Sequence, residues 1–109
     1  MADLKGLKNK RSGIAAYPLT ESDIVAANLC MQEAFPPGEQ FPIEQLLRFA
    51  AGDPARSWLD LWFLDQQFAG FTYTTKVPGD ADRTYLAYLA ISGALRGKGL
   101  GTEILRRVT

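Results

Sequence analysis

Three glycines alternate with basic and apolar residues near the end of the sequence, in residues 95–102 (LRGKGLGT). Glycine adopts positive φ angles and has no side chain, so successive backbone amides of such a loop can converge on one point. The segment lies between an expected strand and an expected helix, whose N-terminus favours negative charge. Arg96 and Lys98 add positive charge. The pattern predicts a pyrophosphate cradle, and a glycine-rich turn without a ligand is the structural alternative.

Two common phosphate-binding motifs do not fit this segment. A P-loop has four residues between its first glycine and Gly-Lys-Ser/Thr, whereas three separate Gly93 from Gly97, and Gly99 follows Lys98. In the dinucleotide-binding fingerprint the third glycine comes one residue later than Gly101, and an acidic residue follows some 20 residues on. The 109 residues end before such an acid. If this segment binds a phosphate, it must therefore belong to another class of anion-binding motif.

The segment resembles motif A of the GNAT superfamily of acyl-CoA N-acyltransferases. That motif reads Gln/Arg-x-x-Gly-x-Gly/Ala after a central strand, and Arg96, Gly99 and Gly101 occupy its three defining positions. Residues 88–92 (YLAIS) resemble the strand that leads into the loop, although Gly93 stands where many members have proline. With the expected order of helices and strands, the resemblance covers nearly the whole chain from about residue 13.

The resemblance implies a cosubstrate, acetyl-CoA, and a reaction. The loop would hold the pyrophosphate, the strand of residues 84–91 would pair with the pantetheine arm, and a primary amine would attack the thioester carbonyl directly. A backbone N–H near Ile91 would polarise that carbonyl. No metal is implied. By position, the acetyl-CoA contacts would be the backbone groups of Ile91, Arg96, Gly97, Lys98, Gly99, Leu100, Gly101 and Thr102.

The acceptor side of the site is less defined. In GNAT proteins the loop between the first two helices helps to shape it, and here that loop is residues 35–42 (FPPGEQFP). Glu39 is the candidate for orienting or deprotonating the amine, with a solvated loop charge as the alternative. Residues 84–91 contain no carboxylate, so the glutamate base that some members carry on this strand is missing. Three tyrosines either line the cleft or pack the sheet: Tyr73, Tyr85 and Tyr88.

Two helices are expected in the first half of the chain. Thr20 can cap the first, with Glu21 and Asp23 in its first turn, and residues 36–38 (PPG) end it. The second follows Pro42, with apolar residues at helical spacing, and stops at residues 52–54 (GDP). These helices would precede the last three strands and enclose the acceptor loop between them.

Strands and a last helix make up the rest. We expect strands at residues 14–19, 58–64, 68–76 and 84–91, and a helix from residue 101. Short connections make the last three strands antiparallel. The fold class is α+β, a mixed, mainly antiparallel sheet flanked by helices, GNAT-like and ending after the motif A helix. Residues 14–109 form this partial domain, and residues 1–13 are expected to be a flexible basic tail, either solvated or gripping an acidic partner.

GNAT domains continue beyond motif A with further strands and a helix. Without them, residues 84–91 would form an exposed apolar edge strand, which favours pairing with a second copy. We therefore expect a homo-oligomer. The alternative to an N-acetyltransferase is a non-catalytic remnant of the domain that binds CoA or another protein. The acceptor cannot be chosen from the fold.

The amino-acid composition excludes several kinds of protein and of functional site. Hydrophobic residues make up 47% of the chain and charged residues 22%, as in a soluble globular domain. The longest stretch without a charged residue is too short for a helix that crosses a membrane. The chain has no histidine, which excludes histidine-based catalysis and histidine-ligated metal sites. Because Cys30 is the single cysteine, the chain can form neither an internal disulfide nor a cysteine-ligated zinc site, and this composition fits a cytoplasmic setting. We expect Cys30, Trp58 and Trp62 to be buried.

The net charge is zero, which argues against a nucleic-acid or anionic-membrane binder. The charges are nevertheless segregated. Residues 12–95 carry four bases and ten acids, whereas residues 96–109 carry four bases and one acid. We expect anions to bind at the basic end, and the acidic middle favours a cationic amine as acceptor.

Overall fold

The computed structural model describes residues 6–12, 19–52, 56–77, 79–97 and 99–108, apart from the side chains of residues 81 and 82. Its elements follow the expected order of one strand, two helices, three strands and a helix. They are β1 (Leu7–Arg11), α1 (Glu21–Ala34), α2 (Ile43–Gly52), β2 (Ser57–Leu64), β3 (Gln67–Val77), β4 (Asp80–Ile91) and α3 (Leu100–Val108), with short 3₁₀ turns η1 (Pro37–Glu39) and η2 (Gly93–Leu95).

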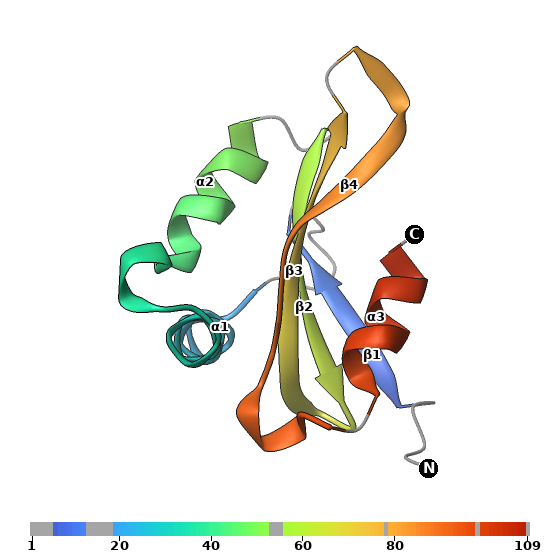
Figure 1. The fold of residues 1–109 in the computed structure, drawn as a ribbon. Coiled ribbons are helices and arrows are strands. Elements are labelled where there is room, and N and C mark those ends of the chain that lie inside the picture. The colour runs from blue at the N-terminus through green and yellow to red at the C-terminus, as the bar shows by residue number, and fades with distance from the viewer. Residues whose placement is uncertain (1–5, 13–18, 53–55, 78, 98, 109) are drawn as a thin grey trace.

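The four described strands form one antiparallel sheet in the order β1-β2-β3-β4. Helices α1 and α2 cover one face of this sheet and α3 covers part of the other (Figure 1). The larger core lies under α1 and α2, around Met31, Ile43 and Phe71. A smaller core lies under α3, around Trp62, Leu100 and Ile104. The α+β class predicted from the sequence, a mainly antiparallel sheet flanked by helices, is confirmed.

Both expected helices begin and end where their local chemistry predicts. The Thr20 hydroxyl accepts from the Asp23 amide at 3.1 Å, and the Asp23 carboxylate accepts from the Thr20 amide at 3.0 Å, which makes a reciprocal capping box. Helix α1 ends before Pro36. The Asn28 side chain accepts from the Ile43 amide at 2.8 Å and so fixes the start of α2 against α1.

The expected flexible tail is wrong for Leu7–Arg11, which form β1 and pair along their whole length with β2. The polar side chains of β1 have a buried partner. Arg11 donates to both carboxylate oxygens of Asp60, at 2.9 and 3.2 Å, and Asn9 donates to one of them at 2.9 Å. The Asp60 side chain is completely buried. Of the strand expected at residues 14–19, residues 14–18 lie outside the described residues, and residue 19 is not in a strand.

The single cysteine and the tryptophans are largely placed as expected. Cys30 is buried, and burial together with nearby Glu33 raises the pKa of its thiol to about 11, although Arg96 acts in the opposite direction. Trp62 is buried and donates to the Thr72 hydroxyl at 2.9 Å, whereas Trp58 is half-buried beneath the Arg11 guanidinium. No helix in the described part of the chain is long and apolar enough to span a membrane.

Candidate functional site

The glycine-rich loop joins β4 to α3 and has the backbone that its sequence predicts. Gly97 and Gly99 have φ angles of 81° and 76°, a conformation that is costly for residues with a Cβ. Nothing lies within 4 Å of the positions that a Cβ would occupy on either residue. Buried Leu95 and Leu100 anchor the loop at its two ends. The loop is therefore held at its ends, and there is open space beside Gly97 and Gly99.

Backbone donors are available where the loop becomes α3. The first intrahelical bond runs from the Glu103 amide to the Gly99 carbonyl at 3.1 Å. The amides of Leu100, Gly101 and Thr102 consequently have no acceptor within the helix. Gly99 precedes the helix and has no side chain with which to cap them. Three amides at the positive end of a helix, beside open space, form an arrangement suited to a phosphate oxygen.

The charges near the loop are partly engaged. Arg96 is exposed, and its Nε donates to the Ile91 carbonyl at 3.1 Å. Arg106 and Arg107 both bind Glu103, and these bonds hold the pKa of the Glu103 carboxyl down to about 2. Arg107 also donates to the Leu7 carbonyl at 2.6 Å and ties α3 to β1. Lys98, the other predicted base, lies outside the described residues.

Strand β4 forms an edge of the described sheet and pairs only with β3. The Ser92 amide donates to the Ala69 carbonyl at 2.7 Å, toward β3. Because successive residues of an antiparallel strand point their backbone groups in opposite directions, the Ile91 amide points to the open edge. Among the described residues, the Ile91 amide thus has no backbone acceptor across the sheet, and it lies on the strand that leads into the glycine loop.

A bulge in β4 alters the face that lies under α2. Tyr88 pairs with Tyr73 and Leu86 pairs with Thr74, so Ala87 is an extra residue. Next to the bulge is a hollow of about 420 Å³, which we call the aromatic hollow. It is lined by Phe41, Gln45, Leu46, Phe49, Tyr73, Thr75, Tyr85, Ala87 and Tyr88. The three tyrosines nominated from the sequence all line it, and Tyr73 also packs in the core.

Glu39 lies in η1 and is exposed. It is not among the described residues that line the aromatic hollow or the neighbouring hollow of about 470 Å³ around Gln40, Phe41 and Pro42. The structure therefore does not place Glu39 in the lining of either hollow. Sequence reasoning missed Phe49 and Gln45, because on α2 they read as part of an ordinary amphipathic helix. These two residues could have been found only from the proximity of α2 to β4, which the sequence alone does not show.

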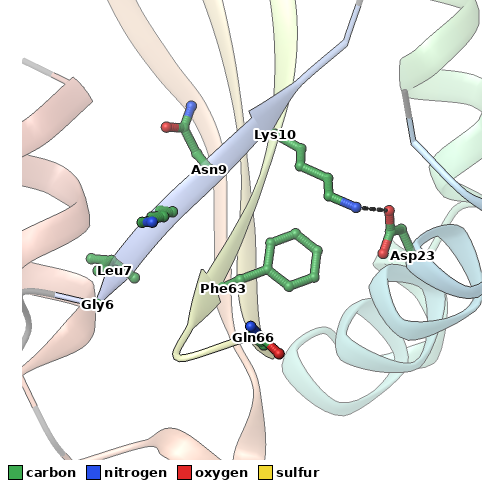
Figure 2. A pocket seen from close by; sticks show the side chains of 8 residues that line it. Gly6, Leu7, Asn9, Lys10, Asp23, Phe63 and Gln66 are labelled. Atoms are coloured by element: carbon green, nitrogen blue, oxygen red, sulfur yellow. Dashed lines mark hydrogen bonds and ion pairs between the residues drawn. The ribbon is translucent and has the colours of Figure 1, made fainter. Parts of the chain in front are cut away.

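Another hollow, of about 730 Å³, lies beside β1, at the opposite edge of the described sheet from β4. Figure 2 shows Lys10 in this hollow reaching the carboxylate of Asp23, at 3.0 Å. The same ammonium lies 5.2 Å from the centre of the Phe63 ring. This ammonium is thus already paired with Asp23 in the first turn of α1, and no residue of the glycine loop is among the described residues that line the hollow. We do not assign the site there.

Comparisons with known proteins agree with the geometry. A sequence model of the Acetyltransferase (GNAT) family matches residues 25–109, which include most of α1, all of α2, the edge strand β4 and the glycine loop. The chain belongs to the GNAT acetyltransferase family. Members of this family use acyl-CoA. A search of curated proteins found no match.

Two solved structures share the GNAT fold with this chain. One, from Desulfovibrio desulfuricans and assigned to the GNAT family of acetyltransferases, has a TM-score of 0.69 and 17% identity over 94% of this chain. The other, an acetyltransferase from Thermus thermophilus, has a TM-score of 0.63 and 22% identity over 96% of this chain. This chain spans 63% of the first structure's length and 68% of the second's.

Proposed function

We propose that this GNAT chain transfers an acetyl group from acetyl-CoA to a primary amine. The observation that carries the proposal is the open glycine loop at the start of α3, directly beside the free edge of β4. One feature can receive a pyrophosphate and the other an extended pantetheine arm. Acetyl-CoA supplies the acetyl group as a thioester.

The residues of this chain would bind and position the reactants. The amides of Leu100, Gly101 and Thr102, with Gly97, Gly99 and Arg96 around them, would hold the pyrophosphate, and Lys98 would add charge. The Ile91 amide at the open edge would donate to the thioester carbonyl and stabilise negative charge on its oxygen. The amine nitrogen then bonds to the carbonyl carbon, the carbon–sulfur bond breaks, and CoA leaves as the thiol after taking up the proton that the amine loses.

Glu39 remains a proposal for the group that orients the amine or takes its proton. It lies in the loop between the two helices but is exposed, so it could act only through water or on an amine that extends toward η1. Replacement by glutamine tests this role. A role in proton transfer predicts a loss of turnover, about a hundredfold, without a change in acetyl-CoA affinity.

Replacing Gly99 with alanine tests the cradle. The Cβ would enter the open space that the pyrophosphate is proposed to fill, at a φ of 76°. Gly79, in the β3–β4 turn, is the matched control, because its φ is 81° and nothing lies within 4 Å of its Cβ position either. Both variants should lose about 1–2 kcal/mol of unfolding free energy. Only Gly99→Ala should weaken acetyl-CoA binding measured by calorimetry, by about tenfold or more.

The outcomes separate the candidate functions. No acetyl-CoA binding by the unaltered chain, or equal binding by both glycine variants, would contradict the cradle. Binding without acetylation of any amine in a broad panel would favour the non-catalytic module. We also propose that the free edge of β4 pairs with a second copy of the chain, which makes a homo-oligomer.

A further inference from the structure

The aromatic hollow has an unusual lining for an exposed surface. Five of its nine lining residues are aromatic: Phe41, Phe49, Tyr73, Tyr85 and Tyr88. The ring centres of Phe41 and Tyr88 lie 5.0 Å apart at 61°, and those of Tyr73 and Tyr88 lie 6.3 Å apart. Phe49 and Tyr85 are nevertheless 57% and 50% exposed. Large aromatic side chains that stay exposed around one concave site are typical of surfaces that bind an apolar group.

The hollow also lacks formal charge. No Asp, Glu, Lys or Arg is among the described residues that line it. Its polar groups are the Gln45 amide, the Thr75 hydroxyl and the tyrosine hydroxyls, and the Thr75 hydroxyl already donates to the Lys76 carbonyl at 3.4 Å. A second ammonium group buried here would have no carboxylate partner, and a carboxylate would have no cation. The sequence-based expectation of a cationic acceptor, drawn from the acidic middle of the chain, finds no support in this lining.

The hollow lies next to the proposed reaction site. Tyr88 and the bulged Ala87 line it, and Ile91 follows Tyr88 by three residues on the same strand, a distance of roughly 10 Å. A ligand whose body fills the hollow can therefore direct an amine toward a thioester that lies on the edge of β4. The volume of about 420 Å³ is within the range of small-molecule sites.

We propose that the aromatic hollow selects a primary monoamine with an aromatic or branched apolar body as the acetyl acceptor. This inference rests on the proposed acetyltransferase function. The rings of Phe49, Tyr85 and Tyr88 would contact the body of the amine, and the neutral nitrogen would point toward the edge of β4. Amines with a second positive charge would be poor acceptors, because the lining gives that charge no partner.

The experiment compares 2-phenylethylamine with 1,4-diaminobutane. Binding of each amine alone is measured by calorimetry, and acetylation of each is measured as release of the CoA thiol at saturating acetyl-CoA. We expect kcat/KM to be at least tenfold higher for 2-phenylethylamine. Phe49→Ala should weaken binding of this amine about tenfold. Leu29→Ala is the control, because Leu29 is 54% exposed on α1 and does not line the hollow.

A second variant reverses the preference. Gln45→Glu adds one carboxylate to the lining with little change in side-chain volume, so it should move the ratio of the two kcat/KM values toward 1,4-diaminobutane by about tenfold. Equal or better use of 1,4-diaminobutane by the unaltered chain would overturn the inference, as would equal losses from Phe49→Ala and Leu29→Ala. If the chain binds 2-phenylethylamine but not acetyl-CoA, the proposed function fails while the chemistry of the hollow stands.

Discussion

At the scale of single residues, Asp23 combines the cap of α1 with an ion pair. Burial by itself would raise the pKa of its carboxyl, but hydrogen bonds from the Thr20 amide and the Lys10 ammonium outweigh burial and lower it. A carboxyl whose pKa is lower in the folded chain stabilises the fold above its unfolded pKa, and that stability is lost as the pH falls through the folded value. Asp23 should therefore contribute to stability at neutral pH and progressively less in acid.

We predict that Asp23→Asn lowers the unfolding free energy by about 1 kcal/mol at pH 7 and by less at pH 3. Urea unfolding at several pH values measures this difference. Glu21→Gln is the control, since Glu21 is exposed in the same helical turn and makes no part of the capping box. A deficit for Asp23→Asn that stays constant from pH 7 to pH 3 would contradict the assignment.

The helix boundaries and the backbone of the glycine loop could be predicted from the sequence because the features that determine them are local. The Thr20 cap, the proline that ends α1 and the positive-φ glycines of the loop each depend on a few neighbouring residues. The part of the aromatic hollow that α2 contributes could not be predicted in the same way. Phe49 and Tyr85 lie 36 positions apart and meet only because α2 packs over the sheet next to β4.

At the scale of secondary-structure elements, β1 was the strand that could not be predicted. Its sequence, LKNKR, contains one apolar residue in five, and charged edge strands resemble solvated tails in composition. What fixes β1 is the buried Asp60 on β2, 49 residues from Arg11, whose charge needs partners. A single sequence does not reveal that an aspartate within an apolar strand will be buried and paired.

We predict that Arg11→Ala destabilises the fold by about 2 kcal/mol, because Asp60 would keep only Asn9 as a side-chain partner among the described residues. Arg11 is itself 44% exposed, which keeps the loss below that of a fully buried pair. Lys8→Ala, at an exposed position of the same strand, should change stability by less than about 0.5 kcal/mol. Thermal and urea unfolding give both values, and similar losses for the two variants would show that Asp60 does not hold β1.

At the scale of the whole molecule, the two edges of the described sheet differ in what they offer. β1 is a short, charged strand that is further tied to α3 by the bond from Arg107 to the Leu7 carbonyl. β4 is twelve residues long, bears exposed Tyr85 and Tyr88, and pairs with β3 alone. Since charge and shortness discourage strand addition, association and pantetheine binding should both take place at β4. The two events would then compete for the same backbone groups.

This competition gives a prediction for the assembly. The chain has a mass of 12.0 kDa, and light scattering should give a larger average mass at high micromolar concentration, which falls toward 12.0 kDa as acetyl-CoA is added. Thr84→Lys places a charge at an exposed position on the β4 edge and should reduce association without ligand, whereas Gln32→Lys on α1 adds the same charge elsewhere and should not. A monomer at every concentration contradicts pairing through β4. An oligomer that persists in saturating acetyl-CoA indicates a different interface, because a strand and a pantetheine arm cannot occupy one edge together.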